Sequence, residues 1–119
     1  MNFTTEKAIY VQIADRLCDE ILTGKFVDDE RIPSVREYAV LLEVNTNTAV
    51  KSYDLLEQQG VIYKKRGLGY FVTAGAKQRI LDERKKEFME VRLPEQFRQM
   101  RLLGIGIDEV DEAWKRDGE

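Results

Sequence analysis

Histidine is absent from this sequence, and cysteine occurs only once, at Cys18. The lack of histidine excludes catalysis, metal binding and pH sensing that depend on an imidazole. A single cysteine cannot form a disulfide within the chain, so we expect Cys18 to be a reduced, buried apolar residue, with a reactive thiol as the alternative. No apolar run approaches the roughly 18 residues of a membrane span, and the N-terminal segment lacks the apolar core of a signal peptide. The sequence therefore predicts a cytoplasmic protein with no membrane partner.

The residue groups that most enzymes use are missing as well. The sequence shows no carboxylate pair, Cys/His cluster, nucleophile–base set or phosphate-binding loop. The Gly67-Leu68-Gly69 segment lacks the rest of any nucleotide-binding fingerprint. We therefore expect a protein that is not an enzyme and that binds no cofactor and no metal.

An excess of positive charge is also lacking. The net charge of −3 and the pI of about 5.2 argue mildly against nucleic acid as a partner. Residues 1–75 carry 9 Lys and Arg against 11 Asp and Glu, and residues 76–119 carry 10 against 11, so an anionic partner must contact a local patch. What is present, 43% hydrophobic and 34% charged residues over 119 positions, is typical of a folded chain that forms either one domain or one small domain with an extension.

The first 60 residues have apolar positions at helical spacing. Gly24 and Gly60 follow two of these periodic segments and fit the glycine that ends a helix. The pattern predicts three helices, over residues 8–23, 34–42 and 45–59.

Polar residues mark where the second and third of these helices begin. Ser34 and Glu37 form an S-x-x-E capping box, and Asn45 is a good N-cap. Only Glu43 and Val44 lie between the two helices, so the helices must cross steeply, as in a helix-turn-helix.

Two strand-like runs follow, at residues 61–64 and 69–73, and both are rich in β-branched and aromatic residues. A turn at Lys65–Leu68, which contains Gly67, separates them, so the pattern predicts a β-hairpin. Three helices followed by a hairpin form a winged helix. The expected fold class is therefore mostly α with one small β-hairpin.

The remaining residues are highly charged and predict short helices. We expect a helix over 76–92, an interruption at Leu93-Pro94, a second helix from Pro94, a break at Gly104–Gly106 and a last helix capped by Asp108. We read the cationic run at 84–86 as one salt-bridged face of the first helix.

These helices carry narrow apolar stripes with too little sequence around them for an independent core. Such stripes indicate either a homodimer interface or packing against the helix at 8–23, and the two are compatible. The candidate dimerisation residues are Ile80, Phe88, Phe97, Met100, Leu103, Ile107, Val110 and Trp114.

Several motifs occur together in the first 75 residues. IPSVR at 32–36 opens the second helix, Asn45 and Thr48 open the third, LEQQG at 56–60 ends it, and GLGYFV at 67–72 forms the wing. In this order and spacing they resemble the DNA-binding domain of the GntR family of bacterial transcription regulators. Three positions depart from that pattern: Asp29 and Glu43 stand where relatives often have glycine or a small residue, and Thr46 where they often have Arg or Pro.

The short helical tail resembles the YtrA-like subfamily, whose members lack a large effector domain. The resemblance implies a winged-helix DNA-binding domain at 1–75 and a helical dimerisation extension at 76–119. It also implies a homodimeric regulator, most plainly a repressor, that binds a palindromic site in double-stranded DNA. The alternative is a winged-helix protein-interaction module without DNA-binding activity. The sequence leaves open a small-molecule effector of unknown identity.

The start of the third helix has the chemistry that reads base edges in a major groove. Asn can bridge N6 and N7 of adenine, and Thr can contact a base or the thymine methyl group. Asn45 can serve the helix cap, the DNA or both, whereas Thr46 and Asn47 have no evident structural duty. Thr48 can also serve the cap, and Lys51 lies one turn further, within reach of a phosphate or a guanine edge.

Cations and glycines supply the rest of the candidate DNA-binding surface. Arg36 stands in the first turn of its helix, where a cation needs an anionic partner: Glu37, Glu57, a phosphate or a guanine. Ser34 can cap that helix or bind a phosphate. The wing residues can form a solvated turn or lie in a minor groove, which attracts Lys and Arg, and they are Lys64, Lys65, Arg66, Gly67 and Gly69.

Overall fold

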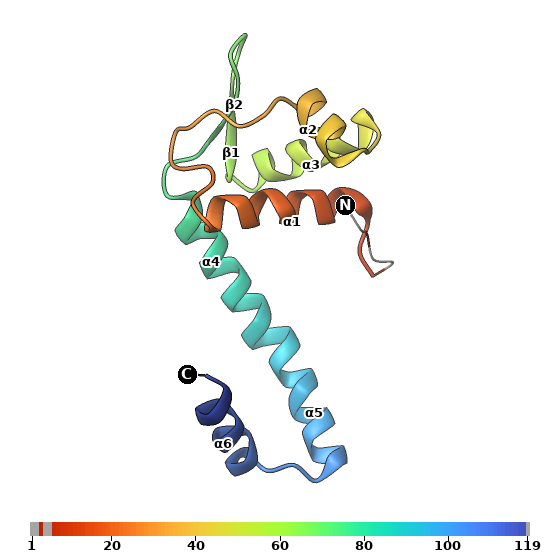
Figure 1. The fold of residues 1–119 in the computed structure, drawn as a ribbon, viewed down its shortest axis with the longest axis vertical. Helices are drawn as coiled ribbons and strands as arrows, with labels where there is room; N and C mark the ends of the chain where they lie inside the picture. The colour runs from red at the N-terminus through yellow and green to blue at the C-terminus, as the bar shows by residue number, and fades with distance from the viewer. Residues whose placement is uncertain (1–2, 4–5, 119) are drawn as a thin grey trace. The chain divides into compact units, whose positions relative to one another are not determined.

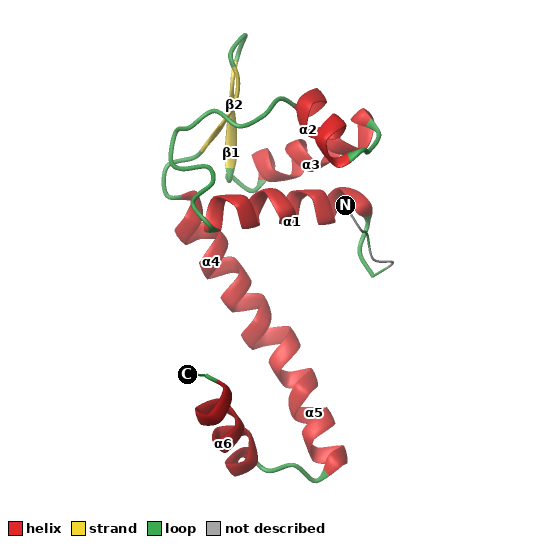
Figure 2. Cartoon of the chain, viewed as in Figure 1, coloured by secondary structure: helices red, strands yellow, loops and turns green. Residues whose placement is uncertain are grey.

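The structure is a computed structural model, and it describes residue 3 and residues 6–118. The chain divides into two compact units, one ending at Asp82 and the other beginning at Glu83. Figure 2 shows helices throughout, with a single two-stranded antiparallel hairpin among the described residues. The predicted fold class, a winged helix-turn-helix followed by a short helical extension, is confirmed.

The elements of the first unit agree with the predicted helices and hairpin to within one or two residues. In the hairpin, Ile62 pairs with Val72 and Lys65 with Gly69. The elements are α1 Ile9–Leu22, α2 Val35–Leu42, α3 Thr46–Gln58, β1 Ile62–Lys65 and β2 Gly69–Val72. Helix α3 packs against α1, α2 and β1, so it lies at the centre of this unit (Figure 1).

The hydrophobic core of the first unit extends past the wing into helix α4, Ala76–Glu87. Ala76 and Ile80 are almost fully buried in the same cluster as Ile13 and Leu17 of α1. The first compact unit thus ends about seven residues after residue 75, where we expect the DNA-binding domain to end. The assignment of residues 1–75 to DNA binding and of residues 76–119 to dimerisation stays a prediction. Cys18 is buried, as expected.

Three tyrosines connect α2, α3 and the wing. Tyr53 of α3 lies between Tyr38 of α2 and Tyr70 of β2, with ring centroids 6.1 and 5.1 Å away. Its hydroxyl donates to the carbonyl of Pro33 at 2.6 Å, and the Tyr38 hydroxyl donates to the buried carboxylate of Glu20. Burial raises the pKa of both Tyr38 and Tyr53. These contacts fix α3 relative to the start of α2 and to the wing.

A third strand-like segment, which the sequence pattern did not predict, pairs with β2. The Asp29 amide donates to the Val72 carbonyl at 2.8 Å, and the Val72 amide donates to the backbone carbonyl of Glu30 at 3.0 Å. The Ile32 amide donates to the Tyr70 carbonyl at 3.0 Å. Arg31 forms the isolated bridge with Phe71. The loop before α2 is therefore held along the wing.

The predicted caps of α2 and α3 are present. The Ser34 hydroxyl accepts from the Glu37 amide at 3.1 Å, and Glu37 accepts from the Ser34 amide at 3.0 Å, which completes the capping box. Asn45 Oδ1 accepts from the Asn47 amide at 2.7 Å. Glu43 ends α2 with φ of 56°, a left-handed conformation that glycine adopts more easily.

The second unit differs from expectation in two places. Helical backbone continues from α4 through a π-helical turn, η1 Phe88–Arg92, into α5 Leu93–Leu103, without the predicted interruption at Leu93-Pro94. The Leu93 amide donates to the Phe88 carbonyl five residues back, and Pro94 sits in the first turn of α5, the part of a helix that tolerates proline best.

The last helix, α6 Ile107–Asp117, begins two residues earlier than the predicted cap requires. Gly106 is the N-cap residue, and Asp108 lies inside the first turn without a capping hydrogen bond, so the predicted capping by Asp108 is wrong. There Asp108 complements the helix dipole. The predicted break is present, with Gly104 in a left-handed conformation at the end of α5. No helix among the described residues is long and apolar enough to cross a membrane.

Replacing Tyr53 by Phe should lower the free energy of unfolding by about 1–2 kcal/mol, because the carbonyl of Pro33 loses its buried donor. Urea unfolding measures this change. Tyr63→Phe is the matched control, since its hydroxyl bonds to Asp29 at the surface, and its effect should stay within about 0.5 kcal/mol. Equal effects of the two substitutions would show that the buried hydroxyl has no special role.

Replacing Asn45 by Ala should cost about 1 kcal/mol of stability, because the Asn47 amide at the start of α3 loses its acceptor. Asn45→Ser should keep most of the stability, since serine is a comparable N-cap residue. Thermal unfolding of both variants tests the pair, and a serine variant as unstable as the alanine variant would contradict the capping role.

Candidate nucleic-acid interface

The first turn of α3 presents side chains that have no structural duty within the chain. Thr46 and Asn47 are exposed, and neither side chain forms a hydrogen bond in the part of the chain that the structure describes. Lys51, one turn later, is also exposed. Asn47 takes part in the cap only through its backbone amide, so its side-chain amide stays available.

Asn45 and Thr48 are tied more closely to the helix. A bidentate contact with adenine requires both the oxygen and the nitrogen of an Asn amide, and Asn45 Oδ1 is already occupied by the cap. Thr48 is half-buried, and its carbonyl accepts from the Ser52 hydroxyl at 3.2 Å. At the start of α3, the side chains of Thr46 and Asn47 are therefore free to contact DNA, whereas Asn45 and Thr48 are constrained by the helix.

Arg36 is exposed at the second position of α2, beside the capping box. Hydrogen bonds from Ser34 lower the pKa of Glu37, with a smaller contribution from the charge of Arg31. The carboxylate of Glu37 is thus occupied by the cap, and no described acidic residue forms an ion pair with Arg36. Of the partners that the sequence leaves open for Arg36, Glu37 and Glu57 do not pair with it here.

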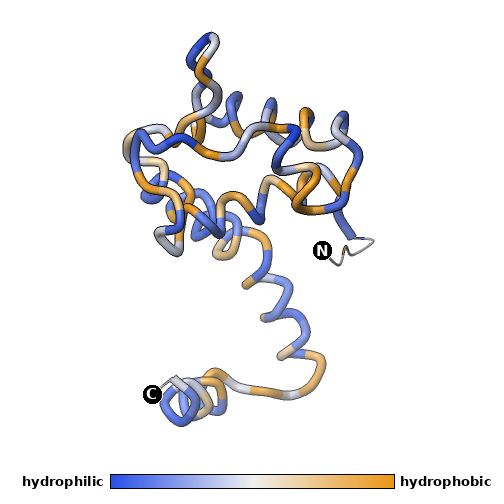
Figure 3. Tube along the Cα trace, turned by 45° about the horizontal axis from the view of Figure 1, so that its top comes forward, coloured by the Kyte–Doolittle hydropathy of each residue, from blue (hydrophilic) through white to orange (hydrophobic). Residues whose placement is uncertain are grey.

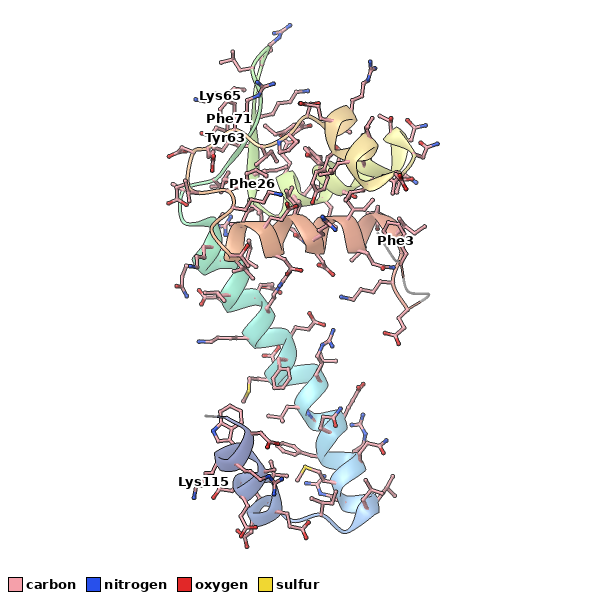
Figure 4. The ribbon with its side chains drawn as sticks, in the orientation of Figure 1. Phe3, Phe26, Tyr63, Lys65, Phe71 and Lys115 are labelled. Carbon is pink, nitrogen blue, oxygen red and sulfur yellow. The ribbon has the colours of Figure 1, made fainter. Side chains whose placement is uncertain are left out.

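The lysines of the wing lie over aromatic rings. Lys64 Nζ is 5.8 Å from the Tyr70 centroid on one face of the hairpin. On the other face, Lys65 Nζ is 4.7 Å from Phe71 and 5.9 Å from Tyr63, and these two rings stack at 5.7 Å (Figure 4). Cation–π contact holds each ammonium group at a defined place on the wing.

The tip of the wing consists of Arg66, Gly67 and Leu68, all exposed. Gly67 has φ of +78° and open space around its Cα, so glycine is needed there for conformation. Gly69 also has a positive φ, +108°, and a Cβ atom there would in addition lie 3.2 Å from Nε of Arg31. The sequence motifs did not single out Arg31. The signal available in the sequence was the step from charged Arg31 to apolar Ile32, and these two residues are exposed and buried in the structure.

The candidates therefore belong to three neighbouring places in one unit: the start of α2, the start of α3 and the hairpin. Figure 1 shows α2, α3 and the hairpin on the same side of α1. Tyr53 joins these places directly, through the carbonyl of Pro33 beside Ser34 and through the ring of Tyr70.

Most candidate dimerisation residues are exposed or half-buried within the single chain. Leu103 and Trp114 are 70% and 76% exposed, and Figure 3 shows hydrophobic and hydrophilic stretches alternating along the second unit. Ile80 is an exception that corrects the prediction. It is 4% exposed in the core of the first unit, because the first turns of α4 close that core.

Comparison with known proteins agrees with this arrangement. The model of the family described as bacterial regulatory proteins, gntR family, matches residues 9–72. An uncharacterized HTH-type regulator of Bacillus subtilis, YhcF, is 34% identical over 114 residues, which cover 96% of this chain and 93% of that protein. The repressor YtrA of the same organism is 30% identical over 104 residues, covering 87% and 79%.

Solved structures extend the comparison. A GntR-family regulator from Bacteroides thetaiotaomicron matches with a TM-score of 0.80 and 50% identity, covering 92% of this chain and 95% of that one. The DNA-binding domain of AraR in complex with operator ORX1 matches with a TM-score of 0.54 and 27% identity, covering 60% and 93%. With the family model matching more than half of its length, this chain belongs to the GntR family of bacterial transcription regulators, which bind DNA through a winged helix-turn-helix.

Proposed function

We propose that this protein is a homodimeric repressor that binds a palindromic operator through α3 and the wing of each subunit. The exposed, unbonded side chains of Thr46 and Asn47 at the start of α3 carry the proposal. A recognition helix reads base edges with the residues of its first turn, and amide and hydroxyl groups suit that task. Two such helices fit half-sites whose centres are about one DNA turn, roughly 10 bp, apart.

Affinity and selectivity come from different residues in this proposal. Arg36 and the wing cations bind phosphates or a narrow minor groove, since their charges have no ion-pair partner among the described residues. Thr46 and Asn47 supply sequence preference, with Lys51 as a further contact. Asn45, Ser34 and Thr48 chiefly shape the helix starts, and Gly67 and Gly69 let the wing backbone approach DNA.

The homodimer would form through the second unit. Many of its apolar side chains are exposed to solvent in the single chain, and exposed apolar patches mark interaction surfaces. A second copy of the chain is the partner that would bury them symmetrically. The residues proposed for this interface are Phe88, Phe97, Met100, Leu103, Ile107, Val110 and Trp114. YtrA, a repressor by its name, matches 104 residues of this chain, more than the first unit alone contains.

Further parts of the proposal follow from a DNA target. The protein acts in the cytoplasm, where bacterial DNA lies. It is a transcription regulator, as YhcF and YtrA are by their names, and has no catalytic activity. A protein-interaction module without DNA-binding activity is the competing function. It would be favoured if no genomic fragment were retarded by the purified protein.

Arg36→Ala should weaken binding to a selected operator by about 1–3 kcal/mol, because a cation without an internal partner no longer reaches the DNA. Fluorescence anisotropy with a labelled duplex measures the affinity. Unchanged affinity would remove Arg36 from the interface.

Asn47→Ala should change sequence preference more than it changes binding to unrelated DNA. Selection from a random-site library with wild type and variant tests this expectation. Recovery of the same motif by both proteins would show that Asn47 does not read the operator.

Trp114→Glu and Leu103→Glu should each shift the protein from dimer towards monomer, since a buried, unpaired carboxylate is costly at an apolar interface. Sedimentation velocity gives the oligomeric state. Val27→Glu makes the same change at an exposed apolar residue of the first unit and should leave the dimer intact. A monomeric wild type, or dimers that persist in both tail variants, would refute the proposed interface.

A further inference from the structure

Arg31 lies on the wing through the strand-like segment before α2. It is paired with Phe71, and its successor Ile32 is buried on the opposite face, so the side chain of Arg31 points to the outer face of the hairpin. That face also carries Tyr63 and Lys65, in register with Phe71 and Gly69. The backbone pairing therefore gives Arg31 a fixed place near the end of the wing.

Gly69 lets the guanidinium group extend along the hairpin. The position that a Cβ atom would take at Gly69 lies 3.2 Å from Nε of Arg31 and 3.7 Å from one of its terminal nitrogens. A Cβ atom at 69 would force this side chain to shift by a few tenths of an ångström, and the φ of +108° also favours glycine at this position. The glycine thus brings the charge of Arg31 close to the turn at Arg66 and Gly67.

The carboxylates closest to Arg31 in sequence all have other partners. Asp28 accepts from the Gly75 amide at 3.2 Å, Asp29 from the Tyr63 hydroxyl at 2.9 Å, and Glu30 from the Val27 amide at 2.9 Å.

Glu37, the acidic residue whose pKa Arg31 helps to lower, is bonded to the amide of Ser34. Within residue 3 and residues 6–118, no ion pair involves Arg31. Four acidic groups in its neighbourhood are therefore engaged in holding the fold, while this cation stays exposed and available to an external anion.

We propose that Arg31 binds a phosphate of the DNA backbone beside the wing. Its guanidinium group lies beside Gly69 of the wing, and its charge acts on Glu37, the neighbour of Arg36 in α2. Its charge therefore extends from the wing towards the start of α2. A guanidinium group presents a planar fork of donors that matches a phosphate. This inference rests on the proposed function and adds a contact that the winged-helix motifs alone did not reveal.

The test measures how the affinity of the full-length protein for a labelled duplex of about 20 bp and mixed sequence depends on KCl between about 50 and 200 mM. Removing one bound phosphate from the interface lowers the slope of log K against log[salt] by about 0.9. Arg31→Ala should therefore reduce the slope by about 0.9 per subunit, and Arg31→Lys should retain most of it. Lys77→Ala, which removes an exposed cation of α4, is the matched control and should leave the slope unchanged.

The outcomes separate this inference from the proposed function. If wild type does not bind DNA at low salt, the proposed function fails. If wild type binds and Arg36→Ala lowers the slope while Arg31→Ala and Arg31→Gln leave it at the wild-type value, the role of Arg31 is refuted. Circular dichroism of each variant checks that the fold is kept, and the exposed position of Arg31 makes folding of the variants the expected result.

Discussion

The contacts of Tyr53 hold together every part of the proposed DNA-binding surface. Its ring separates Tyr38 from Tyr70, and its hydroxyl reaches the carbonyl of Pro33, so one side chain fixes α3 against α2, the wing and the loop before α2. A winged helix has only a small core, and a buried polar group with a single good partner defines one arrangement of that core. The position of the recognition helix relative to the wing, and hence the shape presented to a duplex, depends on this residue.

Capping decides which polar residues remain for DNA. Helix starts need acceptors for their free amides, and Ser34, Glu37 and Asn45 provide them. At the start of α3, the neutral side chains of Thr46 and Asn47 remain without hydrogen-bond partners among the described residues. Cations lie nearby, and the acidic groups beside them already accept hydrogen bonds within the protein. An acidic protein can in this way present a locally cationic, hydrogen-bonding surface, because the carboxylates nearest to those cations accept hydrogen bonds from other groups of the protein.

Local patterns in the sequence were enough to predict the helices of the first unit, the hairpin and the capping box. Each depends on neighbours within a few residues, such as Ser34 with Glu37. The strand-like pairing of residues 29–32 was not predictable in the same way, since it depends on β2, about 40 residues away. The interruption predicted at Pro94 is absent for a related reason: proline is tolerated in the first turn of a helix, and the π turn that places Pro94 at the start of α5 has no signal in the local pattern. Ile80 has the spacing of a tail residue, but the core that buries it is built by α1 and the wing.

Glu43, at the turn between α2 and α3, has a left-handed backbone conformation with φ of 56°. A residue with a Cβ atom in that conformation costs about 1–2 kcal/mol relative to a regular helical geometry, and glycine relieves much of it. Position 43 lies between the two helices of the motif and outside the set of residues proposed to meet DNA. It therefore offers a compensating substitution: variants that alter operator preference at the cost of stability can regain part of that stability at a turn outside the proposed DNA-binding surface.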